Sequence, residues 1–93
     1  MTFDLDSRVI AEPSVLAAHV RDETVLLSVS DGVYYSVDGS ADRIWELLHD
    51  EISIAGIVET ITTEFDVDSD RCAGDVISFV SELADKGLVR VVV

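Results

Sequence analysis

The stretch that decides the fold is GVYYSVDGSADRIWELLHD, residues 32–50, in which the hydrophobic period changes from that of a strand to that of a helix. The run from Val33 to Val37 is rich in β-branched and aromatic residues, as strands are. It follows Asp31-Gly32, a strong hairpin-turn signal because glycine accepts the positive φ that such turns require. We therefore expect a strand at Val33 to Val37 that leaves a tight turn.

The second half of this stretch has the period of an amphipathic helix. Its apolar residues recur at i, i+3, i+4 and i+7: Ala41, Ile44, Trp45 and Leu48. The pattern predicts a helix over residues 40–49. Ser40 is the expected N-cap, because a serine side chain can accept a hydrogen bond from the first turn.

Two more apolar runs precede the turn, Val15 to Val20 and Thr24 to Val29, with polar residues between them. Together with the strand at Val33 to Val37 they predict a three-stranded antiparallel meander. Residues 1–13 mix acidic and apolar side chains and end at Pro13. We expect them to form an extended arm or a loose first strand.

Two further helices are expected after residue 50. Ser53 is placed to cap the first, whose apolar stripe stays in register: Ile54, Ile57, Val58, Ile61 and Phe65. The next helix is expected to run from Asp68 or Ser69 to about Lys86. Gly87 then stands where a left-handed glycine would end it.

The order of elements indicates the fold class. Three strands, then three helices, then a terminal strand or docked tail at Leu88 to Val93 predict an α+β fold with a winged-helix-like layout. The length fits a single domain over residues 1–93. We expect no segment to be left over for a second layer or a cleft.

The charge balance is strongly acidic. The chain has 19 Asp and Glu residues against 6 Lys and Arg residues, a net charge of −13. Such a surface repels polyanions, so nucleic acids and anionic membranes are disfavoured as partners, while a basic peptide or basic protein face is favoured. The alternative is that the charge only keeps the domain soluble, because net charge bears on solubility and association rates rather than on fold.

The sequence also bears on localisation. Its single cysteine, Cys72, cannot form an internal disulfide and fits a reducing compartment. The first residues, MTFDLDSRV, lack the basic and apolar regions of a secretory signal, and no apolar run is long enough to span a membrane. We therefore expect a cytoplasmic protein.

Residues able to do chemistry are few. A nucleophilic Cys–His pair needs adjacent side chains, and the spacing of Cys72, His19 and His49 gives no sign of one, so Cys72 is expected to be a small buried hydrophobe. Four aspartates lie close together in sequence: Asp66, Asp68, Asp70 and Asp75. They lack the glycine and the closing glutamate of a calcium loop. We expect no catalytic residue, no metal and no cofactor.

The third strand is a candidate open edge of the meander, and it carries two adjacent tyrosines. Successive strand residues face opposite sides, so one of Tyr34 and Tyr35 should face the core and the other should face out. An open edge with an amphipathic aromatic residue can accept an added strand, the β-augmentation mode of peptide binding. A core tyrosine beside an ordinary surface tyrosine is the alternative.

The third helix is apolar along two rows. One row is Cys72, Val76, Phe79 and Leu83, and the other is Ala73, Ile77, Val80 and Ala84. One row suffices to pack a surface helix on a small core. The second must pack on something else, either within the protein or on a bound partner, and the sequence leaves both open.

The quoted stretch resembles the strand-then-helix signature of PqqD-like domains, the precursor-peptide recognition elements of ribosomally made, modified peptides. The shared pieces, in order, are Gly32-x-Tyr34-Tyr35, Ile44-Trp45-x-Leu47-Leu48, Phe65-Asp66-Val67, Asp75-Val76 and Gly87-Leu88. They span about residues 24 to 90, and their order and spacing make the match specific. Asp38 and Ala41 depart from the asparagine and glycine of many relatives, and both changes are conservative for a turn and a helix start.

The free-standing length, the acidic start of the third helix and the N-terminal segment look most like the small B protein of lasso-peptide clusters. That resemblance implies a non-enzymatic domain that binds the leader of a precursor peptide. A separate leader peptidase, which is transglutaminase-like, and an ATP-dependent macrocyclase are implied to do the chemistry. A recognition element of another peptide-modifying pathway, PQQ synthesis included, stays open.

The resemblance implies that the leader pairs as a strand with the third strand and lays apolar side chains into a groove against the third helix. The peptide-binding residues expected on this basis are Val33, Tyr34, Tyr35, Ser36, Val37, Asp75, Val76, Phe79, Val80 and Leu83. Either Tyr34 or Tyr35 is expected to face the groove. Asp75 is a candidate partner for a basic leader residue.

Two alternatives to leader binding, from other functional classes, remain open on the sequence. A winged-helix nucleic-acid binder is compatible with the order of elements, but the third helix has only Arg71 and Lys86 as basic residues. An acyl-carrier-like protein is also small and acidic, and Ser69 stands near a helix start where such a protein is modified. Carriers are all-helical, however, and the N-terminal half of this chain predicts strands.

Overall fold

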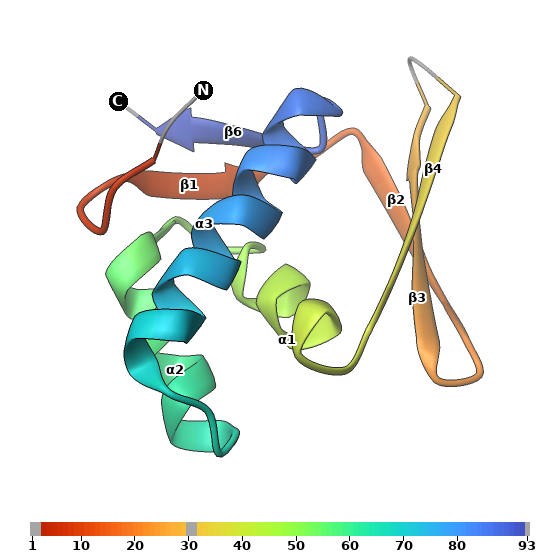
Figure 1. Ribbon diagram of the computed structural model, residues 1–93. Coiled ribbons are helices and arrows are strands. Elements are labelled where there is room, and N and C mark those ends of the chain that lie inside the picture. The colour runs from red at the N-terminus through yellow and green to blue at the C-terminus, as the bar shows by residue number, and fades with distance from the viewer. Residues whose placement is uncertain (1–2, 30–31, 93) are drawn as a thin grey trace.

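The computed structural model describes residues 3–29 and 32–92. In chain order the elements are β1 (Arg8–Ala11), β2 (Val15–Val20), β3 (Glu23–Ser28), β4 (Val33–Asp38), α1 (Gly39–Leu47), β5 (Ile52–Ser53), α2 (Ile54–Glu64), α3 (Ser69–Asp85) and β6 (Val89–Val92). Figure 1 shows α3 in the middle of the view, with the β2–β4 sheet to one side and β1 with β6 to the other. The α+β class, with a meander followed by three helices, is confirmed.

The predicted meander forms as a three-stranded antiparallel sheet in the order β2-β3-β4. Leu26 at the centre of β3 stands opposite Ala17 on one side and Tyr35 on the other, and it is fully buried. Gly32 has a φ of +67°, as expected of the glycine in the turn before β4. The other half of the predicted turn, Asp31, lies outside the described residues.

A second sheet is present that the sequence pattern did not reveal. Its order is β5-β1-β6, and both pairings are antiparallel, with Val9 opposite Ile52 and opposite Val91. The expectation that no segment is left for a second layer is therefore wrong. The N-terminal segment contributes β1, and the terminal strand pairs with β1 rather than docking on the meander. Val9, on the central strand, has no exposed surface, so this pairing encloses part of the core.

The start of the first helix also differs from the expectation. Asp38 rather than Ser40 is the N-cap of α1, and its side chain makes no capping hydrogen bond. Gly39 has a φ of +58°, which lets the chain turn directly from β4 into the helix. β4 and α1 are therefore continuous, and Ser40 lies inside the first turn.

The ends of the other two helices agree with the sequence. The Ser53 side chain accepts a hydrogen bond from the Gly56 amide at 3.0 Å, and the Asp68 carboxylate accepts one from the Arg71 amide at 3.0 Å. Gly87 has a φ of +75° just beyond the end of α3.

The core lies where the three helices meet the inner faces of the two sheets. Both sheets, α2, α3 and the residue that ends α1 contribute fully buried side chains, among them Val9, Leu26, Leu48, Ile57, Val80 and Leu83. Within the described residues, no helix has the length and apolar character needed to cross a membrane.

Candidate peptide-docking site

β4 is an edge strand. It pairs with β3 along its whole length, from Val33 opposite Ser28 to Asp38 opposite Glu23. Along its other edge, no strand among the described residues pairs with it. The outward-facing backbone groups of an edge strand can pair with an added strand. The open edge expected from the sequence is therefore present.

The two tyrosines of β4 face opposite sides of the sheet. Tyr34 stands opposite Leu27 on the outer face, and 72% of it is exposed. Tyr35 stands opposite Leu26 on the inner face and is half-buried. Its ring centroid lies 6.3 Å from that of Phe79 on α3, and the Lys86 Nζ lies 5.5 Å from the Tyr35 centroid. Tyr35 is therefore the tyrosine that faces α3.

The surroundings of Tyr35 keep its hydroxyl neutral. Burial raises the pKa of Tyr35 above its ordinary value of 10.0, and the nearby Glu82 carboxylate raises it further by repulsion and by a hydrogen bond. A neutral phenol can donate a hydrogen bond to the Glu82 carboxylate while its ring packs against Phe79. Tyr35 thus spans the space between the edge strand and the helix.

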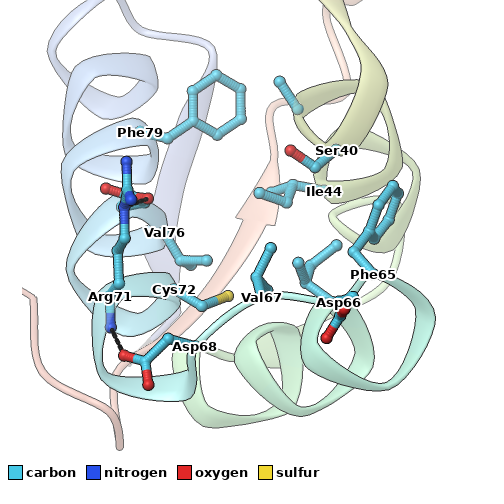
Figure 2. Close-up of a pocket in the computed structure, with 13 residues that line it drawn as sticks. Ser40, Ile44, Phe65, Asp66, Val67, Asp68, Arg71, Cys72, Val76 and Phe79 are labelled. Carbon is cyan, nitrogen blue, oxygen red and sulfur yellow. Dashed lines mark hydrogen bonds and ion pairs between the residues drawn. The ribbon is translucent and has the colours of Figure 1, made fainter.

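A pocket of about 610 Å³ lies between α1, the end of α2 and the first half of α3. Figure 2 shows Cys72, Val76 and Phe79 along the α3 wall, with Ser40 and Ile44 facing them from α1. Phe65 and Val67, at the end of α2 and in the connection to α3, close the remaining side. Because α1 continues directly from β4, the pocket begins where the edge strand ends.

The pocket combines an apolar interior with a charged rim. Val67, on its wall, is 47% exposed even though it is apolar. Three aspartates stand among the lining residues: Asp66, Asp68 and Asp75. The one cation among them, Arg71, has its Nε 3.9 Å from Asp75 Oδ2, and both side chains are largely exposed. Such a pocket favours a guest with apolar side chains and a nearby positive charge.

The predicted site residues separate into two groups. Asp75, Val76 and Phe79 line the pocket, and Val33 to Val37 form the open-edge strand. Val37 is 3% exposed, so only its backbone is available. Ser36 is exposed and donates a hydrogen bond to Glu23 across the sheet at 3.0 Å.

Three predicted contact residues on α3 belong to the core: Val76, which lines the pocket but is 1% exposed, and Val80 and Leu83. Val80 and Leu83 each have 0% exposure, and neither lines the pocket. A docked segment cannot touch their side chains in this conformation, so we withdraw them from the contact surface. The second apolar row of α3 packs inside the protein, since Ile77 and Ala84 also pack against the core. Phe79 remains the large half-buried side chain on the pocket side of the helix.

The sequence pattern missed the part of the pocket that α1, α2 and the connection from α2 to α3 contribute. These residues are Ser40, Ala41, Ile44, Ile61, Phe65 and Val67. In the sequence, most of these residues have the spacing of ordinary core positions in amphipathic helices. Val67 carried a usable signal, because it is an apolar residue between two aspartates in a connection where polar residues are expected.

The pocket includes one thiol, whose surroundings lower its reactivity. Cys72 lies on its wall, but burial raises the pKa of the Cys72 thiol, and the nearby Asp75 charge raises it further. A raised pKa reduces the thiolate, which is the reactive form. Within residues 3–29 and 32–92, no group of three or more His, Cys, Asp or Glu side chains is placed to hold a metal ion.

Comparison with known proteins identifies close relatives of this arrangement. The family model described as Coenzyme PQQ synthesis protein D (PqqD) matches residues 23–89. A solved structure described as TbiB1 in complex with the TbiA(beta) leader peptide is similar at 34% identity and a TM-score of 0.80, covering 87% of this chain and 94% of that chain. No curated protein matches the chain by sequence.

Two further solved structures share the fold. One is a lasso peptide synthetase B1 complexed with its leader peptide, at 24% identity and a TM-score of 0.78, covering 88% of this chain and 96% of that chain. The other is the PqqD truncation of Methylobacterium extorquens PqqCD, described as a stand-alone recognition element for ribosomally synthesized and post-translationally modified peptides. It has 18% identity and a TM-score of 0.78, and covers 95% of this chain and 94% of that chain.

Proposed function

The chain belongs to the PqqD family, and on that basis we propose that it binds the leader segment of a ribosomally synthesised precursor peptide as an added strand on β4. The observation that carries this proposal is that the free edge of β4 leads directly into an apolar pocket walled by α3. A structural relative at 34% identity is described in complex with a leader peptide.

The backbone of Val33 to Val37 supplies the strand pairing in this proposal. In an added strand, alternate side chains point to opposite faces, so every second residue of the leader points toward α3. Those side chains meet Tyr35 and the half-buried Phe79 beside the strand, where the leader passes toward the pocket. Main-chain pairing then supplies affinity and the pocket supplies selectivity.

The rim aspartates give the proposed leader a charge preference. Asp75 lies beside the apolar wall and pairs only at 3.9 Å with Arg71, so it can pair with a basic leader residue. The net charge of −13 attracts a basic peptide and speeds its encounter with the domain. Both effects weaken as salt concentration rises.

The proposed role is delivery rather than catalysis. The raised pKa of the Cys72 thiol argues against a nucleophile in the pocket. A leader peptidase and an ATP-dependent macrocyclase are the proposed partners that process the precursor. The single cysteine also supports a cytoplasmic place of action, where a thiol stays reduced.

The proposed pathway is that of a lasso peptide. It rests on the sequence resemblance and on one similar structure, at 24% identity, that is described as a lasso peptide synthetase B1 with its leader peptide. A PQQ precursor is the alternative guest, because the family model carries that description. Parallel titrations with a lasso leader and a PQQ precursor will separate them, and we expect the lasso leader to bind at least about tenfold more tightly.

The test of the groove is fluorescence polarisation with a labelled leader peptide. Phe79→Ala removes the ring that meets Tyr35, and we expect it to weaken binding by at least about tenfold, as truncation of an aromatic anchor does. Leu5→Ala is the matched control, because Leu5 is 47% exposed and lies outside the pocket.

Circular dichroism establishes that both variants are folded before affinities are compared. Unchanged leader affinity in folded Phe79→Ala protein would show that the groove assignment is wrong. Retarded mobility of double-stranded DNA in a gel-shift at low salt would instead favour the winged-helix nucleic-acid binder, since non-specific DNA binding is strongest there.

A further inference from the structure

The meander has a second open edge, on the side away from β4. The strand order β2-β3-β4 leaves β2 paired on one side only, and no other strand among the described residues covers it. Its six residues, VLAAHV, contain no proline and no Asp, Glu, Lys or Arg. All but Val15 are exposed, and Leu16 and Val20 are 58% and 53% exposed although both are apolar.

An edge of this kind is unusual for a strand that stays unpaired. Edge strands are commonly protected by charged side chains, by proline, by a bulge or by a covering segment. β2 pairs with β3 without a bulge, from Val15 opposite Ser28 to Val20 opposite Glu23. The strand therefore has the features of one that pairs with a further strand.

We propose that β2 pairs antiparallel with β2 of a second copy of this chain, about a two-fold axis at Ala18, so that two meanders form one continuous sheet. An axis perpendicular to the sheet keeps each face on its own side. It places Leu16 opposite the partner's Val20 on the outer face and Ala17 opposite the partner's His19 on the inner face. Ala17 and Ala18 at the centre leave room for the two strands to approach.

The outer face of the sheet supports this pairing. Leu16 stands opposite Leu27, which in turn stands opposite Tyr34, so an apolar row crosses the meander from one edge to the other. Tyr34 is 72% exposed in this row. The proposed register continues the row into the second copy through the partner's Val20, so exposed apolar surface becomes covered at the junction.

The charge of the chain sets the strength and the salt dependence of the dimer. Two copies of net charge −13 repel each other; β2 itself carries no acidic residue, but Asp22 and Glu23 follow it, and Glu23 stands opposite Val20. Charges beyond about 8 Å are largely screened at physiological ionic strength. Added salt should therefore strengthen the dimer, whereas it should weaken the binding of a basic leader.

The junction is small by the standard of stable dimers. A six-residue edge and two pairs of apolar side chains bury less than the roughly 1,200–2,000 Å² typical of stable interfaces. We therefore expect a weak dimer that forms only at high protein concentration. Because β2 and β4 are opposite edges of one sheet, dimer formation leaves β4 free. This inference does not depend on the proposed leader binding.

Sedimentation equilibrium of the intact chain over a series of protein concentrations tests the dimer. We expect the average mass of the wild type to rise toward that of a dimer, more so at high salt. Ala17→Lys places a charge on the exposed edge and should raise the dissociation constant at least about tenfold. Ala55→Lys, at an exposed position on α2, makes the same change elsewhere and should behave as the wild type.

A cross-link tests the register without relying on Ala17→Lys. In a Cys72→Ala background, Ala18→Cys should form a covalent dimer on mild oxidation, because the two-fold axis brings the two Ala18 positions together. Ala55→Cys in the same background should not. Monomeric mass at every concentration and salt level, or equal cross-linking of the two cysteine variants, would overturn the proposal.

Discussion

The ring of Tyr35 on β4 lies with its centroid 6.3 Å from that of Phe79 on α3, and the two planes are tilted by 50°. This contact joins the open edge of the meander to the helix that walls the pocket. The Lys86 ammonium group also lies over the Tyr35 ring, with its Nζ 5.5 Å from the ring centroid. An added strand on β4 must therefore lie beside this aromatic pair.

The two tyrosines of β4 form a matched pair for testing the docking surface. Tyr35→Ala removes the ring that faces α3, and we expect leader affinity to fall by about fivefold or more, since aromatic contacts contribute about 0.5–1.5 kcal/mol beyond area burial. Tyr34→Ala removes the same group from the outer face and should have a smaller effect. Fluorescence polarisation measures both, and a larger loss for Tyr34→Ala would reverse the assigned faces.

The ionisation of Tyr35 is open to direct measurement. Tyr34→Phe leaves Tyr35 as the sole tyrosine, so ultraviolet absorbance at rising pH follows its ionisation alone. We expect a midpoint above 10.0 in the folded protein, because burial and Glu82 raise the pKa of Tyr35, and a return to the ordinary value in urea.

The same shift has a consequence for stability. A raised pKa in the folded state means that the contribution of Tyr35 is present below pH 10.0 and is lost as pH rises through the folded pKa. The stability difference between wild type and Tyr35→Phe should therefore change above pH 10.0 and stay constant below it. Urea unfolding over this pH range measures the difference, and a constant difference throughout would contradict the assignment.

An ion pair between Arg43 and Glu64 links α1 to the end of α2 beside the pocket. The Arg43 Nε lies 2.8 Å from Glu64 Oε1, and the Arg43 Nη2 lies 2.9 Å from Glu64 Oε2. The hydrogen bonds from Arg43 lower the pKa of Glu64 below 4.5. The stabilisation is thus present above the unfolded-state pKa and is lost as pH falls through the folded one.

Glu64→Gln should lower the melting temperature at neutral pH, and the difference from wild type should shrink as the pH falls below 4.5. Glu59→Gln, at an exposed position on the same helix, removes the same charge and serves as the control. Differential scanning calorimetry gives both values. Equal effects of the two variants at neutral pH would show that the pair itself contributes nothing.

Leu83 separates core packing from peptide contact on α3. Its side chain has no exposed surface, so Leu83→Ala should reduce the free energy of unfolding by about 2–5 kcal/mol. Urea denaturation measures that loss. Leader affinity of the protein that remains folded should stay near the wild-type value, and a selective loss of affinity with little loss of stability would return Leu83 to the contact surface.

Local patterns sufficed for the elements that neighbouring residues define. The meander, the caps at Ser53 and Asp68 and the left-handed Gly87 follow from short-range periods and hydrogen bonds, which a window of a few residues contains. The family signature could be recognised for the same reason, because its pieces keep their order and spacing. The prediction that Ser40 caps the first helix was wrong, because Gly39 allows α1 to start directly after β4.

The sequence by itself thus determined an acidic α+β domain with an edge strand followed by helices. Only the tertiary structure decided that β1 and β6, from opposite ends of the chain, pair in a second sheet. It also decided that Tyr35 rather than Tyr34 faces α3, and that the Val80 and Leu83 side chains are buried in the core. Periodicity states which residues share a face, but what covers that face depends on contacts between segments far apart in the chain.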